Sequence, residues 1–322
     1  MMNGSEGLNN GRKVAEGGVL LALYSILLLL VVQLPFLIFL FFFLPAPFIL
    51  AAIKQKLSWS FGMLFMASLL ATVLGMVSQI PMVLVTGLVG ITIGYHIQHD
   101  KSPILMFIRT VLVFIAGFAI MAASAALFFH INFISLYKQF MKQALLQIDK
   151  SAGLLSSMGQ TSAGQFKDQF IERAELIMTL LPSLIVTASI FMVLLFLWAA
   201  HPILKRFSPK KTAWPRFREI QLPKSILWYY LITMILLAVI HPDKGSTWYI
   251  VLMNLFSILQ FFMTIQGLSL FFYISYIKKL PKAVPVILVI ASFFIPIIQS
   301  AVRLLGIIDL GFPFREYIRK KN

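Results

Sequence analysis

The stretch GGVLLALYSILLLLVVQLPFLIFLFFFLPAPFILAAI at positions 17–53 decides the fold class. A helix that crosses a bilayer needs about 20 apolar residues, so this stretch is too long for one span and long enough for two. Gln33-Leu34-Pro35 is the expected turn between them, because Pro breaks a helix. The solvent for this part of the chain must be lipid.

The whole composition agrees with a membrane protein. Apolar residues make up 60% of the 322 residues, charged residues make up 12%, and the mean hydropathy is +0.91. Soluble domains use about half apolar and about a quarter charged residues. The chain has no cysteine, which excludes disulfides, a thiolate nucleophile and cysteine-based metal sites.

Pro, Gly and charged residues divide the chain into further apolar segments, and together they predict an all-α polytopic bundle of eight or nine spans. The expected segments are 17–33, 35–53, 61–79, 81–96, 103–130, 176–198, 225–240, 247–277 and 284–305. Six spans are assigned to a first unit, 1–201, which includes an outer amphipathic loop at 131–175. A basic loop follows at 202–224, and 225–322 holds the additional spans and a charged tail. His201-Pro202 and His241-Pro242 are expected to end spans.

The basic residues lie mainly in the breaks between spans. The net charge is +16, and the positive-inside rule together with anionic lipid explains it better than nucleic acid, which we exclude as a partner. The loop at 202–224 is expected in the cytoplasm on the strength of Lys205, Arg206, Lys210, Lys211, Arg216, Arg218 and Lys224. Nine spans would place the basic tail outside, against this rule, so the last segment is either re-entrant or the span number differs.

The segment 133–148 follows the i, i+3, i+4, i+7 pattern of an amphipathic helix on the outer side. It is either a lid over an outward-facing pocket or a helix that lies in the outer interface.

Small and polar residues that recur on one face of a span mark its contact with another helix or with a cavity. Ala15, Gly18, Ala22 and Ser25 form such a groove in the first span, where another helix could dock. Asn254, Ser257, Gln260 and Thr264 step by three or four along the eighth span, and neighbouring helices, water or a polar ligand are the possible partners. Gln33, Gln79, His130 and Asn254 are expected toward the outer ends of their spans. The candidate ligand-binding residues are therefore Gln33, Gln79, His130, Asn254, Ser257, Gln260 and Thr264.

No catalytic residues are assigned. The chain lacks the P-loop and GxSxG motifs, and Asp309 and the other candidate carboxylates lie at span edges. His96, His99 and Asp100 have a spacing that suits a metal, but no third strong ligand lies nearby. We expect no enzyme, no metal and no cofactor.

The C-terminal third carries the most specific family likeness. Trp214-Pro215-Arg216-Phe217, Gln266-Gly267-Leu268 and Leu305-Gly306-Ile307-Ile308-Asp309 ahead of Arg315 resemble the YybS-like family of bacterial membrane proteins, which has no established activity. The first six spans resemble the substrate-binding S-components of energy-coupling-factor vitamin transporters. That likeness implies that Gly18-xxx-Ala22 docks on a coupling subunit and that an ATPase acts in trans.

Two functions remain open at this point. The first is a binding or transport component of the bacterial cell membrane for a small, vitamin-like molecule, without an ATPase of its own. The second is a non-transporting scaffold or regulatory protein whose basic loop binds a cytoplasmic partner or anionic lipid.

Overall fold

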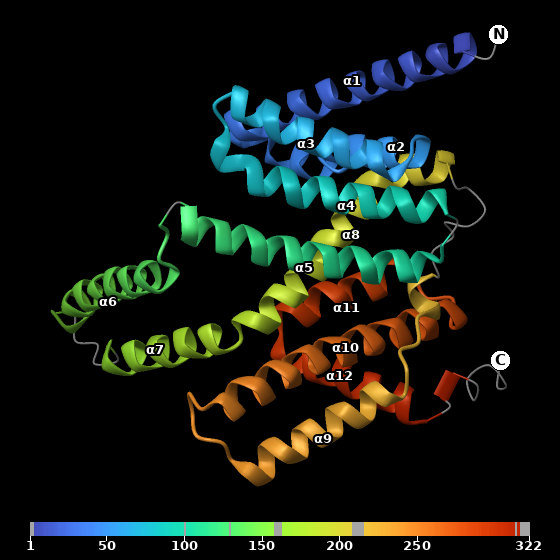
Figure 1. The fold of residues 1–322 in the computed structure, drawn as a ribbon. Coiled ribbons are helices and arrows are strands. Elements are labelled where there is room, and N and C mark those ends of the chain that lie inside the picture. The colour runs from blue at the N-terminus through green and yellow to red at the C-terminus, as the bar shows by residue number, and fades with distance from the viewer. Residues whose placement is uncertain are drawn as a thin grey trace. The chain divides into compact units, whose positions relative to one another are not determined.

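The computed structural model describes residues 3–99, 101–128, 130–157, 163–207, 216–312 and 314–315, and every regular element in these ranges is helical. Figure 1 shows the order of the helices. The α-helices are α1 (Asn3–Gln33), α2 (Ala46–Lys54), α3 (Leu57–Val73), α4 (Ile80–Gln98), α5 (Pro103–Phe128), α6 (Phe133–Ser157), α7 (Ala163–Thr179), α8 (Leu181–Phe207), α9 (Ser225–Ile240), α10 (Thr247–Ile277), α11 (Ala283–Phe294) and α12 (Pro296–Gly311). Short 3-10 helices are η1 (Pro35–Phe43), η2 (Val77–Gln79) and η3 (Phe217–Glu219).

The all-helical membrane class is confirmed, and the number of full-length spans is smaller than predicted. Six helical segments in the described ranges are long and apolar enough to cross a membrane, or seven if α11 and α12 count as one bent span. Helices α3 and α9 are apolar but shorter. All nine expected segments are largely helical, although 35–53 consists of η1 and α2, and 284–305 consists of α11 and α12. The count is smaller because α3 and α9 are short and because α11 and α12 are bent.

The chain folds into two compact units. The N-terminal unit comprises Met1–Ala144 and Ala188–Trp214, and the C-terminal unit comprises Leu145–Thr187 and Pro215–Asn322.

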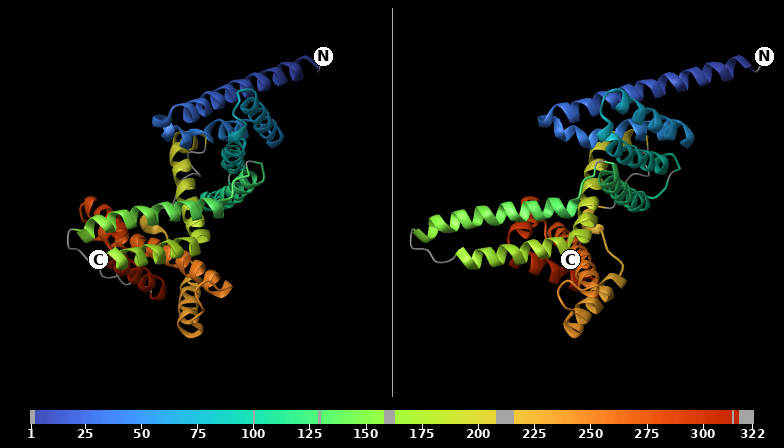
Figure 2. Two further views of the ribbon diagram at one scale, coloured as in Figure 1. Left: turned by 90° about the vertical axis from the view of Figure 1, so that its left-hand side faces the viewer. Right: turned by 60° about the vertical axis from the view of Figure 1, so that its left-hand side comes forward.

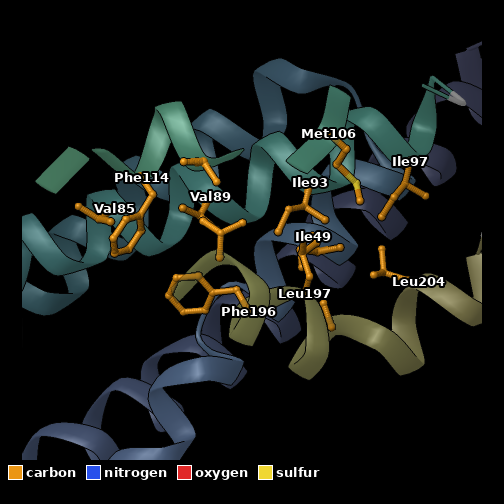
Figure 3. Packing of buried hydrophobic residues seen from close by; sticks show 13 residues of the cluster. Ile49, Val85, Val89, Ile93, Ile97, Met106, Phe114, Phe196, Leu197 and Leu204 are labelled. Carbon is orange, nitrogen blue, oxygen red and sulfur yellow. The ribbon is translucent and has the colours of Figure 1, made fainter. Parts of the chain in front are cut away.

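Helix α4 is central to the N-terminal unit. One apolar cluster joins α4 to α2, α5 and α8, and Figure 3 shows Val89 and Ile93 of α4 facing Phe196 and Leu197 of α8. A second cluster joins α4 to α1, α2 and α3. Together these clusters bury α4 on several sides, which agrees with its apolar composition all round.

Glycines on α4 allow α2 to approach closely. A Cβ atom at Gly94 would lie 2.6 Å from both the Cβ of Ala52 and the carbonyl oxygen of Ile49, and one at Gly90 would lie 2.5 Å from the carbonyl oxygen of Pro45. The GxxxG pair of α4 thus serves internal helix packing.

The predicted span end at His201-Pro202 is wrong. Helix α8 continues through Pro202 and ends at Phe207. Proline at this position removes one backbone hydrogen bond, yet helices in apolar surroundings tolerate proline when other contacts hold the helix in place. Ala200 and Leu204, on either side of Pro202, are buried in the apolar cluster. The other expected end is confirmed, because α9 ends at Ile240 and His241 adopts a left-handed conformation with φ 43°.

In the C-terminal unit, α9 and α10 form an antiparallel hairpin. The rings of Tyr230 and Phe256 stack with centroids 5.4 Å apart, and further along, the backbone N–H of Leu222 bonds to Gln266. Helices α11 and α12 are bent by 117° across Ile295, so α12 turns back after α11 ends.

The predicted amphipathic helix is present as α6. Its C-terminal part and α7 lie side by side, as Figure 2 shows, and Lys167 of α7 donates to Asp149 of α6 at 2.8 Å. Lys244, in the loop before α10, donates to Glu172 of α7 at 3.0 Å. This hydrogen bond and the charge of Lys244 lower the pKa of Glu172, and the same contact raises the pKa of Lys244. Whether α6 acts as a lid stays a prediction.

Candidate functional site

Helices α10 and α12 meet at two glycines. A Cβ atom on Gly267 would overlap the carbonyl oxygen of Val302, and one on Gly306 would overlap that of Met263. Helical Cβ atoms point toward the N-terminus of their own helix. The contacts between the two helices advance together along the chain, since Met263 meets Gly306 and, three residues further on, Gln266 meets Asp309, so α10 and α12 run in the same direction.

A buried ion pair lies beside this crossing. The side chain of Asp309, at the end of α12, is fully buried, and Nη2 of Arg315 donates to its Oδ2 at 2.7 Å. Nε of Arg315 donates to both carboxylate oxygens at 3.1 Å. Gln266 of α10 also donates to Oδ2 of Asp309. Pairing of this kind is what makes a buried carboxylate tolerable, because an unpaired one would cost several kcal/mol.

The same groups hold the short helix η3 and the residues that follow it against α10. Arg315 donates from Nη1 to the carbonyl oxygen of Arg218 at 2.9 Å and from Nη2 to that of Ile220 at 3.0 Å. Ser269 accepts from Arg315 at 3.1 Å and itself donates to the carbonyl oxygen of Phe217 at 2.8 Å. We call Gln266, Ser269, Asp309 and Arg315 the Arg315 cluster. It supplies hydrogen-bond donors to the carbonyl groups of Phe217, Arg218 and Ile220, in a segment too short to satisfy all of its backbone groups by itself.

The Arg315 cluster places the end of α12 beside the C-terminal half of α10. Arg315 bonds to the segment that carries Arg218, so both lie at the same end of the unit. At a rise of about 1.5 Å per residue, neither α11 nor α12 reaches the roughly 30 Å thickness of the hydrocarbon core. The bend of 117° and the parallel course of α10 and α12 therefore describe a re-entrant hairpin.

Among the candidate ligand-binding residues, Asn254 is engaged in internal contacts. Its Oδ1 accepts from the backbone N–H of Ser183 at 2.8 Å, and its Nδ2 donates to the carbonyl oxygen of Thr179. Asn254 thus joins α10 to the start of α8 and the end of α7, which is a packing role.

Three of the candidates form a polar face on α10, which we define as Ser257, Gln260 and Thr264. All three side chains are half-buried. Thr264 donates to the backbone carbonyl of Gln260 at 2.9 Å. The side chains of Ser257 and Gln260 have no hydrogen-bonding partner within the part of the chain that the structure describes.

The remaining ligand candidates belong to the N-terminal unit. Gln33 ends α1 and is exposed, Gln79 precedes α4 and is half-buried, and His130 follows α5 and is exposed. No hydrogen bond joins any two of these side chains among the described residues. That they border one ligand site stays a prediction.

The small-residue groove of α1 faces away from the other elements of its unit. Ala15, Gly18 and Ala22 are exposed and Ser25 is half-buried. A Cβ atom at Gly18 would have no neighbour within 4 Å.

The basic loop divides between the two units. Lys205 and Arg206 form the exposed last turn of α8, whereas Lys210 and Lys211 lie outside the described residues. In the C-terminal unit Arg216 is exposed, Lys224 precedes α9, and the guanidinium of Arg218 lies 3.5 Å from the ring centroid of Tyr276.

His96 of the α4 histidine cluster is engaged in contacts within its unit. His96 is buried, its Nδ1 lies 2.7 Å from the carbonyl oxygen of Thr92, and its Nε2 lies 3.4 Å from Nη1 of Arg109. Asp100 falls outside the described residues, and within the described ones no three His, Asp or Glu side chains gather as a metal site requires.

Sequence reasoning did not select the Arg315 cluster as a site. It placed Asp309 at the edge of the last span, and the structure shows that this carboxylate is buried in protein. The available signal was the pairing of an acidic residue with an arginine six positions later at the end of an apolar helix. Gln266 could not be connected to them, because 43 residues separate it from Asp309.

Comparison with known proteins identifies relatives along almost the full length. Residues 22–310 match a family described as "Predicted membrane protein (DUF2232)". The chain is 31% identical over 314 residues to "Uncharacterized protein YybS" of Bacillus subtilis (strain 168), which covers 96% of this chain and 99% of that protein. No solved structure matches. The predicted family likeness is thereby confirmed, and the likeness to S-components stays a prediction.

Proposed function

We propose that this chain, which belongs to the family described as Predicted membrane protein (DUF2232), is a binding or transport component for a small polar molecule in the cell membrane of a bacterium. The observation that carries the proposal is the polar face of α10. Ser257 and Gln260 lie within a candidate span and have no partner among the described residues. An amide or hydroxyl in hydrocarbon without a partner costs a few kcal/mol, so it needs a ligand, water or another polypeptide.

The re-entrant hairpin supports the same proposal. In transporters, helices that stop within the membrane commonly border the substrate site, because their ends offer polar backbone groups. Helix α11 ends at Phe294 and α12 begins at Pro296, both in an apolar stretch. A buried Asp–Arg pair at the end of α12 is also typical of functional membrane segments.

Energy for transport would come from a partner. The chain carries no nucleotide-binding motif. The exposed groove formed by Ala15, Gly18, Ala22 and Ser25 is the surface that we assign to a coupling subunit, because small residues allow close helix approach. The proposal includes no reaction and no catalytic residue.

The test is a ligand search on the purified full-length protein. Native mass spectrometry would identify a co-purified small molecule, and thermal-shift screening with vitamins and their precursors would identify one that stabilises the protein. The double variant Ser257→Ala/Gln260→Ala should lose the ligand-induced shift. Asn254→Ala is the matched control on the same helix, and it should lower the unfolding temperature while keeping the shift.

Absence of any ligand in both experiments, together with no co-purifying ATPase, would overturn the proposal. A ligand whose stabilising effect survives in the Ser257/Gln260 double variant would move the site away from α10.

A further inference from the structure

Two basic segments that are distant in sequence lie at one end of the C-terminal unit. The first, at 216–224, contains Arg216, Arg218 and Lys224, and the second, at 278–282, contains Lys278, Lys279 and Lys282. The ring of Phe217 contacts that of Phe272, with centroids 5.2 Å apart, and Arg218 covers the ring of Tyr276. These contacts, with the bonds of the Arg315 cluster, fix 216–224 along the last turns of α10.

The two segments form one strongly cationic surface, which we call the basic platform: Arg216, Arg218, Lys224, Lys278, Lys279 and Lys282. Five of its side chains are exposed and Arg218 is half-buried. Glu219 is the single acidic residue within 216–224 and 278–282, and it lies 3.9 Å from Arg216 and 3.8 Å from Arg218. Six cations with one nearby carboxylate leave a large positive excess, and this surface attracts anions.

Lys279 of the platform occupies a backbone position at which glycine is ordinarily preferred. Lys279 has φ 51°, and the N–H of Leu280 bonds to Ser275 while that of Lys279 bonds to Tyr276. This is the helix-ending geometry in which glycine is the usual residue, because side chains crowd a left-handed backbone. A lysine with this left-handed backbone lowers the stability of the fold relative to glycine. A functional role for its positive charge would explain its presence.

Exposed aromatic residues place the platform at a membrane surface. Trp228 and Tyr229 in the first turn of α9 are 64% and 59% exposed, and Tyr276 at the end of α10 is 59% exposed. Trp and Tyr concentrate at the level of lipid headgroups, where one side of the ring is apolar and the other is wet. Lys224 lies four residues before Trp228, Lys278 lies two residues after Tyr276, and Arg218 covers the Tyr276 ring, so the platform cations lie at the level of these rings.

From charge and position together, we infer that the basic platform binds the headgroups of anionic phospholipids, and that the Arg315 cluster holds its two halves together. A phosphate group attracts guanidinium and ammonium groups, and near a membrane surface each such cation contributes about 1 kcal/mol. The inference does not depend on the ligand proposed for α10.

The experiment compares lipid retention by purified full-length protein. Native mass spectrometry would count the lipids retained from mixed micelles that contain equal amounts of phosphatidylglycerol and phosphatidylcholine with the same acyl chains. Wild-type protein should retain phosphatidylglycerol in preference. In the variant Lys278→Gln/Lys279→Gln/Lys282→Gln, the ratio of retained phosphatidylglycerol to phosphatidylcholine should fall at least about tenfold, since three cations are removed.

The matched control neutralises three exposed lysines of α6, Lys138→Gln/Lys142→Gln/Lys150→Gln, and should keep the preference. Soluble glycerol phosphate should not displace the lipid, which separates a headgroup at the membrane surface from a free phosphate site.

The single variant Lys279→Gly should unfold at the same temperature as wild type or higher, and it should still lose part of the preference for phosphatidylglycerol. A residue with a purely structural role would not give these two results together.

Arg315→Gln tests whether the Arg315 cluster contributes to lipid binding by the platform. This variant keeps all six platform cations, and its preference for phosphatidylglycerol should fall because 216–224 is no longer held to α10. Equal retention of the two lipids by wild-type protein, or an equal loss in the α6 control, would overturn the inference.

Discussion

Both units use glycine to bring two helices together, and they differ in what surrounds the contact. In the N-terminal unit, Gly90 and Gly94 of α4 pack on α2 within large apolar clusters. In the C-terminal unit, the Gly267–Gly306 crossing has a smaller apolar cluster on one side and the Arg315 cluster beside it. Apolar packing has no direction, whereas hydrogen bonds to Arg315 specify which backbone atoms meet.

The difference indicates two ways of fixing a chain in a membrane. Helices alone satisfy their own backbone groups and can pack through side chains. The segment 216–222 is largely non-helical, so its carbonyl groups need partners from elsewhere, and Arg315 and Ser269 supply them. We therefore expect the stability of the C-terminal unit to depend strongly on single polar side chains. The stability of the N-terminal unit should depend on them less.

The largest effect is expected from Asp309→Ala, which leaves the buried guanidinium of Arg315 without its carboxylate. Removing one partner of a buried pair costs about 3–5 kcal/mol. Tyr24→Phe is the comparison in the N-terminal unit. It removes the buried hydrogen bond of 3.1 Å between Tyr24 and Thr86 and should cost about 0.5–1.5 kcal/mol. Titration with a denaturing detergent in mixed micelles would measure both.

A double variant sharpens this comparison. Asp309→Leu/Arg315→Met replaces both charges with apolar groups and should be less destabilised than Asp309→Ala, because no charge stays unpaired. If the single variant unfolds at the same detergent concentration as wild type, the ion pair does not control the stability of this unit.

The second effect concerns the glycine contact. Gly306→Ala would push a methyl group into the backbone carbonyl of Met263, which cannot move aside as a flexible side chain can. Overpacking of this kind costs about 1–3 kcal/mol. Gly18→Ala on α1 has no neighbour within 4 Å and should leave stability unchanged or slightly raised. Equal unfolding curves for the two variants would contradict the close approach of α10 and α12.

The third prediction separates two polar residues of α10. Asn254→Ala removes the acceptor of the Ser183 N–H and should cost about 1–3 kcal/mol, because that buried donor is left unsatisfied. Gln260→Ala breaks no hydrogen bond of its side chain to a described residue and should not lower stability in the absence of ligand. Thermal unfolding of both proteins without added ligand checks this difference.

The smallest effect is the pH dependence of the exposed Glu172–Lys244 pair. Because the folded pKa of Glu172 is lowered, the pair stabilises the fold above the unfolded pKa of this carboxyl and loses that effect as the pH falls through its folded pKa. Because the folded pKa of Lys244 is raised, the effect is also lost as the pH rises through that value. Hydrogen exchange in the loop before α10 should rise at both extremes in wild type, and less so in Glu172→Gln.

The sequence alone identified the membrane class and the position of every apolar segment. Runs of apolar residues such as 17–53 permit only helices in lipid, since all backbone groups must bond within the segment. The errors of the sequence-based prediction concern the ends and lengths of the spans. Pro202 was taken as a span end, but neighbours such as Leu204 are buried in the core and keep the helix intact.

The tertiary structure alone decided the re-entrant course of α11 and α12, the burial of Asp309 and the union of the two basic segments. Each of these depends on contacts between residues far apart in the chain, such as Gln266 with Asp309 and Arg315 with Arg218. Hydropathy reports the local preference for lipid, and a charge at the end of an apolar helix looks the same whether it faces water or a buried partner. Only the packing of α12 along α10 distinguishes the two.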